Sequence, residues 1–196
     1  MPRLKRPRRK AVVLTATACA GVLAVVLAVT AFSGGGDGVT YVDGNTNAVL
    51  YGSGHRAQAP GFSGTTLTGT QLSSSAYRGK VTVLNFWGSW CVPCRSEAAT
   101  LAVVAEQYRS KGVSFVGIDV RDNTSSAVAF TTSHDVSYPS ISDPGSTITL
   151  NFSTVVPLSS TPTTVVIDKT GHVAGAVFGE TTYGELTAML DKVTSS

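Results

Sequence analysis

The sequence predicts an α/β domain with a mixed central sheet flanked by helices, and two observations carry this prediction. First, the runs 81–87 and 113–119 have the composition of buried strands and enclose a helical pattern over 93–109. A strand, a helix and a strand in succession form a βαβ unit with parallel strands and a right-handed crossover. Second, the strand-like runs 163–167 and 172–178 are joined by a short turn, which predicts an antiparallel pair.

The central elements follow from composition and spacing. Residues 81–87 form a largely apolar run with β-branched and aromatic side chains, which is typical of a strand buried on both faces. Turn signals between Gly64 and Leu72 predict an N-terminal β-hairpin ahead of this strand. The helix ends at Lys111-Gly112. One of its faces carries small and apolar side chains at helical spacing, namely Ala98, Leu101, Ala102, Ala105 and Tyr108.

Residues 120–161 separate the βαβ unit from the terminal strand pair and form a central insertion. Within it, 125–134 has a helical pattern, and 147–152 is compatible with either a short helix or a strand. Beyond the strand pair, Thr182 and Glu185 have the spacing of a capping box, which predicts a C-terminal helix.

Residues 1–32 predict an export segment. Six of the 15 basic residues of the 196-residue chain lie within 1–10, and an uncharged stretch follows over 11–32. As a helix, that stretch is long enough to span a bilayer. The positive-inside rule then leaves 1–10 in the cytoplasm and the rest of the chain outside. Three readings stay open, namely a retained signal anchor, a signal peptide cleaved after Ala31, and lipidation at Cys19.

The remainder of the chain divides into a linker and a domain. Residues 33–58 are rich in Gly, Ser, Asn and Thr and predict a flexible linker, in which packing of 39–42 on the domain stays open. The domain is expected over 59–196. The chain beyond residue 10 contains nine basic and twelve acidic residues. This balance disfavours nucleic acid as a partner, because phosphate binding needs clustered cations on the folded surface.

Cys91 and Cys94 form a Cys-x-x-Cys motif where the central strand passes into the helix. A structural zinc site needs two further ligands, and the three histidines are scattered without ligand spacing. The free N–H groups and the dipole of a helix N-terminus stabilise an anion, so this position favours redox chemistry. We expect Cys91 to be an exposed thiolate and Cys94 to lie close enough to close a disulfide. Pro93 fits the first turn, where its missing N–H costs no hydrogen bond.

The segment NFWGSWCVPCRSE, residues 85–97, resembles the active-site strand and helix of the thioredoxin superfamily. More narrowly, it resembles the exported TlpA/ResA-like thiol–disulfide oxidoreductases, or redoxins, and the resemblance covers about residues 59–193. It implies a thioredoxin-like fold with a redox-active disulfide and neither cofactor nor metal. Thr161-Pro162, directly before a strand, matches the superfamily's cis-proline position. This implies a cis peptide bond facing the cysteines, with the Thr161 backbone free to pair with a substrate strand.

Three further positions bear on the acid–base chemistry of the pair. The superfamily's buried aspartate, six residues before the first cysteine, is Asn85 here, and an amide is no proton acceptor. Glu97 matches the Cys-x-x-Cys-x-x-Glu pattern of the exported reductases and follows Cys94 by almost one helical turn. Two readings of Glu97 stay open, an acid–base group for Cys94 and a solvated surface glutamate. For Arg95, a surface role is favoured over stabilisation of the Cys91 thiolate.

The expected reaction is thiol–disulfide exchange with client proteins. Cys91 attacks a client disulfide, and Cys94, helped by Glu97 or by water, resolves the mixed disulfide. The sequence leaves the direction open, whereas the resemblance favours reduction outside the cell. Apocytochrome c is then a candidate client, and a membrane electron donor is a second partner. The substrate-contact surface is expected to comprise Trp90, Thr161, Val92 and Pro93.

Two alternatives need weighing. A peroxiredoxin resembles Pro-x-x-x-Thr-x-x-Cys before its reactive cysteine, whereas this chain has Leu84 and Gly88 at the proline and threonine positions. The pattern of that enzyme is therefore absent. An exported copper-carrying or partner-binding thioredoxin-fold module stays open, because a Cys-x-x-Cys pair also binds copper.

Overall fold

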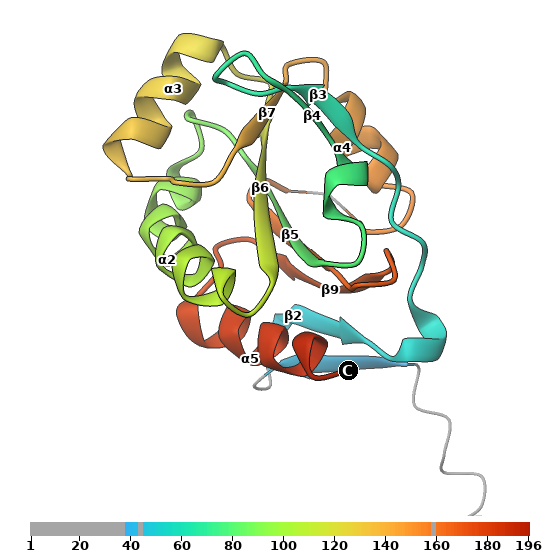
Figure 1. Cartoon of the computed structure of the whole chain (residues 1–196). Coiled ribbons are helices and arrows are strands. Elements are labelled where there is room, and N and C mark those ends of the chain that lie inside the picture. Colours follow the sequence, from blue (N-terminus) through green and yellow to red (C-terminus); the bar gives the residue numbers. More distant parts are fainter. Residues whose placement is uncertain (1–37, 43–44, 158–159) are drawn as a thin grey trace, which may run out of the picture. The chain divides into compact units, whose positions relative to one another are not determined.

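The computed structural model describes residues 38–42, 45–157 and 160–196, whose main feature is a seven-stranded mixed sheet (Figure 1). Its strands are β1 (Val39–Val42), β2 (Asn45–Tyr51), β5 (Val81–Trp87), β6 (Val113–Val120), β7 (Ser140–Asp143), β8 (Thr163–Ile167) and β9 (Val173–Phe178). A separate hairpin joins β3 (Ser63–Thr65) and β4 (Gln71–Ser73). The helices are α2 (Val92–Arg109), α3 (Thr124–Ser133), α4 (Thr147–Phe152) and α5 (Tyr183–Thr194), with a 3-10 turn η2 (Ser74–Tyr77).

The sheet has the order β1-β2-β9-β8-β5-β6-β7. Strands β5, β6 and β7 run parallel, whereas β8 is antiparallel to both β5 and β9. The predicted parallel unit, the antiparallel pair and the N-terminal hairpin are therefore confirmed. The sequence analysis missed β7, because its four residues SISD carry too little apolar pattern to mark a strand.

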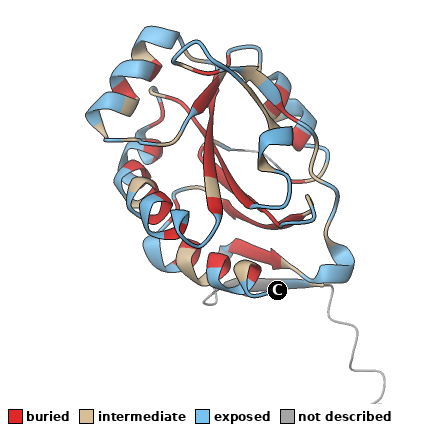
Figure 2. Ribbon diagram, viewed as in Figure 1, coloured by how far each residue is buried: buried red, intermediate tan, exposed pale blue. Residues whose placement is uncertain are grey.

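Two apolar layers enclose the sheet, which explains why every residue of β5 is buried. On one face, Leu101 of α2 and Leu186 of α5 pack against Val83. On the other face, Phe152 of α4 packs with Leu84 among others. Successive strand residues point to opposite faces, so a strand covered on both sides has no polar stripe. Figure 2 shows this pattern, with the buried class concentrated on the central strands.

The helix predictions are largely confirmed. Residues 147–152 adopt the helical alternative as α4. At the start of α5, the Glu185 N–H donates to Thr182 Oγ1 over 3.3 Å and the Thr182 N–H donates to Glu185 Oε2 over 3.0 Å, which is the predicted capping box. In α2, Val104 occupies the buried face, whereas Ala102, expected there, is only partly buried.

The linker expected over 33–58 is wrong for part of its length. Strand β2 pairs antiparallel with β9, with Val49 opposite Ala176, and β1 pairs with β2 at the edge of the sheet. Ala48 and Val49 are buried. The apolar run Ala48-Val49-Leu50 is too short and too closely flanked by polar residues to reveal a strand, and only its pairing with β9 buries it.

Replacing Gly175 by alanine tests this packing. A Cβ at Gly175 in β9 would lie 2.6 Å from the Val49 carbonyl oxygen of β2 and 2.9 Å from Met189 Sδ. The thioether end can shift, but the backbone of β2 can do so only by giving up sheet pairing. We expect Gly175→Ala to lower the free energy of unfolding by about 1–3 kcal/mol in urea titrations. Gly184→Ala in α5 meets no atom within 4 Å and should be neutral or slightly stabilising. Equal effects of both changes would contradict the packing of β2.

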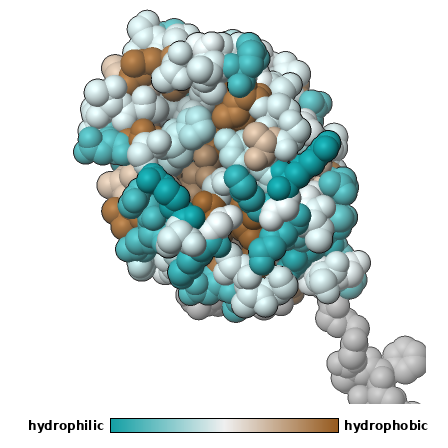
Figure 3. All heavy atoms as spheres, in the orientation of Figure 1, coloured by the Kyte–Doolittle hydropathy of each residue, from teal (hydrophilic) through white to brown (hydrophobic). Residues whose placement is uncertain are grey.

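Among the described residues, no helix has the length and apolar character needed to cross a membrane. The export segment predicted over 1–32 lies outside the described residues. On the face of the domain seen in Figure 3, hydrophobic residues form small separate patches among hydrophilic ones.

Candidate active site

The cysteine motif lies where β5 ends and α2 begins. Trp87 is the last residue of β5, and α2 begins at Val92 with Pro93 in its first turn. Cys91 is the N-cap of the helix, and its sulfur accepts the N–H of Cys94 over 3.2 Å. The two cysteines form a disulfide with their Cα atoms 5.3 Å apart. The predicted closure of the pair is therefore present, and a sulfur occupies the capping role that hydroxyl or carboxylate oxygens usually fill.

Cys91 is buried, which differs from the exposed position expected for it. Only 3% of its surface is accessible, and it packs in a small apolar cluster with Trp87, Cys94 and Ala98. Its sulfur also lies 3.6 Å from the carbonyl oxygen of Thr161. The disulfide and the nearby Thr161 segment cover the sulfur, a tertiary effect that no local pattern at the turn reveals.

The Thr161-Pro162 peptide bond is cis, as predicted. Thr163, the first residue of β8, is paired with Phe86 near the end of β5. Because β8 runs antiparallel to β5, the residues just before β8 lie alongside the turn that follows β5. This register brings the cis-proline segment against Cys91.

The side chains around the motif form an exposed rim. Val92 is 68% exposed, Trp90 is 47% exposed, and Pro93 is also exposed. The Trp90 indole Nε1 donates to the Val120 carbonyl oxygen over 3.1 Å, which fixes the ring while leaving one side open. Arg121 lies over that ring, 5.5 Å from its centroid. These contacts fix the orientation of an exposed apolar surface beside the buried cysteine pair.

Arg95 forms a hydrogen bond with the backbone of the active-site turn. Its guanidinium donates to the Ser89 carbonyl oxygen over 3.1 Å, and the residue is exposed. The surface role favoured for Arg95 is consistent with this contact, which braces the outside of the active-site turn.

Glu97 is buried, so the reading of a solvated surface glutamate is wrong. Its side chain is 1% exposed. Oε1 accepts from Asn85 Nδ2 over 2.8 Å, and Oε2 accepts from the Thr181 N–H over 2.8 Å. Burial raises the pKa of Glu97 to about 7, and the hydrogen bonds from Thr181 and Asn85 oppose this rise only in part. The carboxyl group is therefore able to bind and release a proton near neutral pH.

A small cavity connects this carboxyl network to the sulfur pair. Its lining includes both Asn85, the hydrogen-bond donor to Glu97, and Cys94. Asn85 is fixed by a second bond, from Nδ2 to Thr164 Oγ1 over 3.2 Å. The amide that replaces the superfamily's aspartate thus holds Glu97 beside the space that Cys94 faces.

Sequence reasoning missed Thr181 and Asp122 as parts of this site. Thr181, ahead of α5, supplies a backbone N–H, which any residue type provides, so no sequence signal marks it. Asp122 accepts the Ser89 N–H through Oδ2 over 2.6 Å and thereby anchors the active-site turn. An acidic residue just past a buried strand was the available signal for it.

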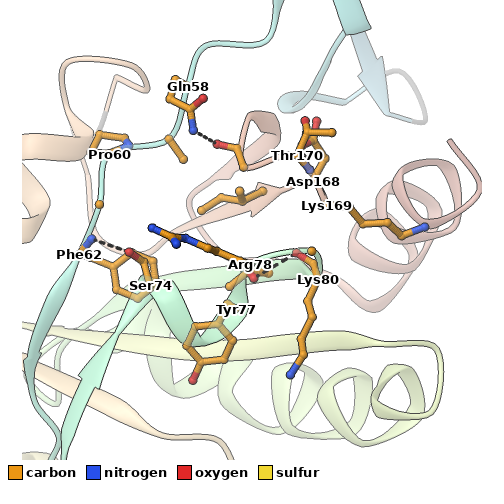
Figure 4. A pocket seen from close by; sticks show the side chains of 16 residues that line it. Gln58, Pro60, Phe62, Ser74, Tyr77, Arg78, Lys80, Asp168, Lys169 and Thr170 are labelled. Carbon is orange, nitrogen blue, oxygen red and sulfur yellow. Dashed lines mark hydrogen bonds between the residues drawn. The ribbon is translucent and has the colours of Figure 1, made fainter.

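A cavity of about 490 Å³ lies apart from the disulfide site. It is lined by residues 58–62, η2 and the turn 168–171, and Figure 4 shows Arg78 pointing into it. Lys80 and Thr82, which contribute to its lining, lie at the start of β5, whereas the cysteines follow the end of β5. Within the described part of the chain, no group of three or more His, Cys, Asp or Glu side chains is placed to hold a metal ion.

A disulfide at the start of a helix, beside a cis-proline segment, is suited to thiol–disulfide exchange. Fold and site together define the class of thioredoxin-fold thiol–disulfide oxidoreductases. The sequence matches the AhpC/TSA family over residues 56–176, and the chain belongs to that family. Its Leu84 and Gly88 still depart from the peroxiredoxin pattern.

Individual relatives agree with this class. The thiol-disulfide oxidoreductase ResA of Bacillus thuringiensis subsp. konkukian is 34% identical over 137 residues, covering 70% of this chain and 77% of the relative. A DsbF homologue from Corynebacterium diphtheriae has a similar structure, with a TM-score of 0.70 and 35% identity over 78% of this chain and 97% of that one. A secreted thiol-disulfide isomerase from Corynebacterium glutamicum has a TM-score of 0.71 and 33% sequence identity, over 81% of this chain and 100% of that one.

Proposed function

We propose that this thiol–disulfide oxidoreductase works outside the cytoplasm as a reductant of client proteins, with electrons restored by a membrane donor. The predicted export segment over 1–32 supports the location, and one structural relative is described as secreted. Residues 11–32 serve as the membrane anchor in this proposal. The resemblance to the exported reductases makes apocytochrome c, before haem attachment, the leading candidate client.

The acidic surroundings of the sulfur pair carry the proposed direction. Glu97 lies buried one helical turn beyond Cys94, and Asp122 binds the turn that carries Cys91. Negative charge near the sulfurs disfavours a thiolate relative to a neutral disulfide. Such a pair gives up electrons readily, which is the property of a reductant.

The reaction proceeds in two exchanges. The Cys91 thiolate, held by the Cys94 N–H, attacks one client sulfur; an S–S bond forms between protein and client, and the second client sulfur leaves as a thiolate. Cys94 then passes its proton to Glu97 and attacks Cys91 Sγ. The Cys91–Cys94 bond forms, the mixed disulfide breaks, and the client departs with both cysteines reduced.

The client is proposed to bind across the exposed rim. Trp90 and Val92 offer apolar contact area, with Pro93 beside them. The Thr161 backbone pairs with an extended client segment, while Pro162 keeps that segment beside the sulfurs.

Trapping with the resolving cysteine removed tests this function. The full chain with Cys94→Ala, made in its own cells, is expected to accumulate mixed disulfides between Cys91 and exported clients, because intramolecular resolution is lost. Mass spectrometry after thiol release identifies the clients. The variant with both Cys91→Ala and Cys94→Ala retains Cys19 and is the matched control. Adducts of equal amount in both variants, or none in either, would overturn the proposal. If no adducts form and the wild type binds copper in a stoichiometric amount, the protein is a copper carrier instead.

A further inference from the structure

Asp119 is a buried carboxyl group that takes no part in the disulfide chemistry proposed above. It lies in β6, between Trp87 of β5 and Ser142 of β7 in the sheet register, and is 0% exposed. Within the part of the chain that the structure describes, neither of its oxygens has a hydrogen-bond partner. An ionised carboxylate in that condition is costly, whereas a protonated one is both neutral and a donor.

Asp122 provides the acceptor for that proton. The two carboxyl groups interact directly, and two ionised carboxylates cannot hydrogen-bond to one another. A proton on Asp119 turns the contact into an O–H···O bond and gives one of the two unpartnered oxygens a partner. Burial raises the pKa of Asp119 to about 7, followed by the charge of Asp122 and by the hydrogen bond that protonated Asp119 donates to Asp122, and the charge of Asp143 adds to this.

Asp122 links this pair to the active-site turn. Its Oδ2 accepts the Ser89 N–H over 2.6 Å, and its Oδ1 accepts the Asn123 N–H over 2.8 Å. Ser89 is two residues before Cys91, whose own N–H donates to the Gly88 carbonyl oxygen over 3.0 Å. The position of Asp122 therefore helps to set the position of the sulfur.

Few charged groups face Asp119 from the elements around it. On β7, Asp143 is held by the N–H groups at the start of α4 and acts only through its charge. Next to Asp122, Arg121 lies over the Trp90 ring. Helix α3 carries no ionisable residue, and His134 at its end stacks on Phe130.

The charged residues of the first turns of α2 are engaged elsewhere. Arg95 bonds to the Ser89 carbonyl, and Glu97 bonds to Asn85 and Thr181. None of these groups supplies a cation to Asp119, so an acidic neighbour that carries or accepts a proton is its natural partner.

We propose that Asp119 holds a proton and donates it in a hydrogen bond to Asp122, and that Asp119 is a positioning residue, which holds Asp122 on the active-site turn and couples the redox state of Cys91–Cys94 to pH. With the proton bound, the two carboxyl groups together carry one negative charge. Loss of the proton adds a second charge behind the turn and repels the Cys91 thiolate. This repulsion disfavours the reduced, dithiol form of Cys91 and Cys94. At alkaline pH the two cysteines are therefore more strongly reducing than titration of their own thiols would make them.

The redox equilibrium of the full chain tests this inference without any client. The wild type and Asp119→Asn are equilibrated with reduced and oxidised dithiothreitol from pH 6 to 8.5, and the disulfide fraction is measured by alkylation and mass spectrometry. The equilibrium constant between the protein disulfide and dithiothreitol should change by about tenfold more over this pH range in the wild type than in Asp119→Asn. A factor of about ten is the effect expected of one added charge near a thiolate. The asparagine keeps the shape and donates to Asp122, but it does not titrate.

The control is Asp135→Asn, an exposed aspartate with a left-handed backbone (φ 53°), which asparagine adopts readily. It should behave as the wild type. Infrared difference spectra between wild type and Asp119→Asn provide a second measurement, in which a protonated-carboxyl band is expected at pH 6 and should fade by pH 8.5. Parallel pH dependence in wild type and Asp119→Asn, or no such band, overturns the proposal. Because no client is involved, either failure is distinct from a failure of the trapping experiment.

Discussion

Replacing Glu97 by glutamine is expected to remove about 3 kcal/mol of pH dependence from the free energy of unfolding. This is the free-energy equivalent of raising the pKa of one carboxyl group from 4.5 to about 7. The physical cause is the burial of Glu97, since the two hydrogen bonds it accepts favour the charged form and compensate only in part.

The sign of the effect follows from proton binding. A carboxyl group with a higher pKa in the folded state binds its proton more tightly there than in the unfolded chain. Its contribution to stability is therefore complete below pH 4.5 and is lost as the pH rises through about 7. Asp119, whose pKa is also raised to about 7, acts in the same direction. The informative quantity is thus the difference between wild type and variant.

Urea unfolding at pH 4.5 and pH 8, followed by tryptophan fluorescence, measures this difference. If the glutamine oxygen accepts the Thr181 N–H, its amide NH2 group faces the NH2 group of Asn85, and two donors then meet. This cost to stability is the same at both pH values. Glu106→Gln on the same helix is the control, because that side chain is 65% exposed and forms an ion pair with Arg109 at the surface. A wild type whose stability changes with pH as that of Glu97→Gln does would show that the carboxyl group is not held as described.

The parts of the site that the sequence predicts are those built from neighbours in the chain. Cys91, Cys94 and Pro93 lie within one turn of a helix whose start is marked by the preceding strand. Thr161-Pro162 stands directly before a strand whose antiparallel pairing with β9 is predicted by the short turn between the two strands. Local spacing places the cysteines, because helix and strand geometry is the same in every protein. The position of Thr161-Pro162 facing them is what the resemblance to the thioredoxin superfamily implies.

The parts that the sequence does not predict depend on long-range contacts. Asp119 and Asp122 meet the active-site turn only through the register of β6 against β5. The burial of Cys91 requires the Thr161 segment, and the burial of β2 requires β9. Such partners are distant in the chain and leave no periodic signal.

Glu97 is an instructive intermediate case. It precedes Leu101 by four residues, and therefore continues the buried stripe of α2 by one more turn. The spacing thus contained the information that Glu97 faces inward, although the residue type argues for solvent. A charged residue in line with a buried stripe is better treated as a functional group than as a surface one.

Phe152→Ala should lower the free energy of unfolding by about 3–5 kcal/mol, the range found for removing a buried aromatic ring. Phe152 is 0% exposed and lies between two other rings, 5.5 Å from that of Phe86 and 6.3 Å from that of Phe62. Its loss leaves a cavity between α4 and β5, the strand that carries the cysteine pair. Thermal or urea unfolding at one fixed pH measures the change.

Leu150→Ala on the same helix is the matched control for this change. Leu150 is 64% exposed, so its truncation should alter stability by no more than about 0.5 kcal/mol. The two variants also separate stability from chemistry. Phe86 contacts Phe152 from the face of β5 opposite to Trp87, which packs with the cysteines. Phe152→Ala, while folded, should therefore exchange disulfides at the wild-type rate. A slower exchange by the folded variant would mean that the two faces of β5 are mechanically coupled at the sulfur pair.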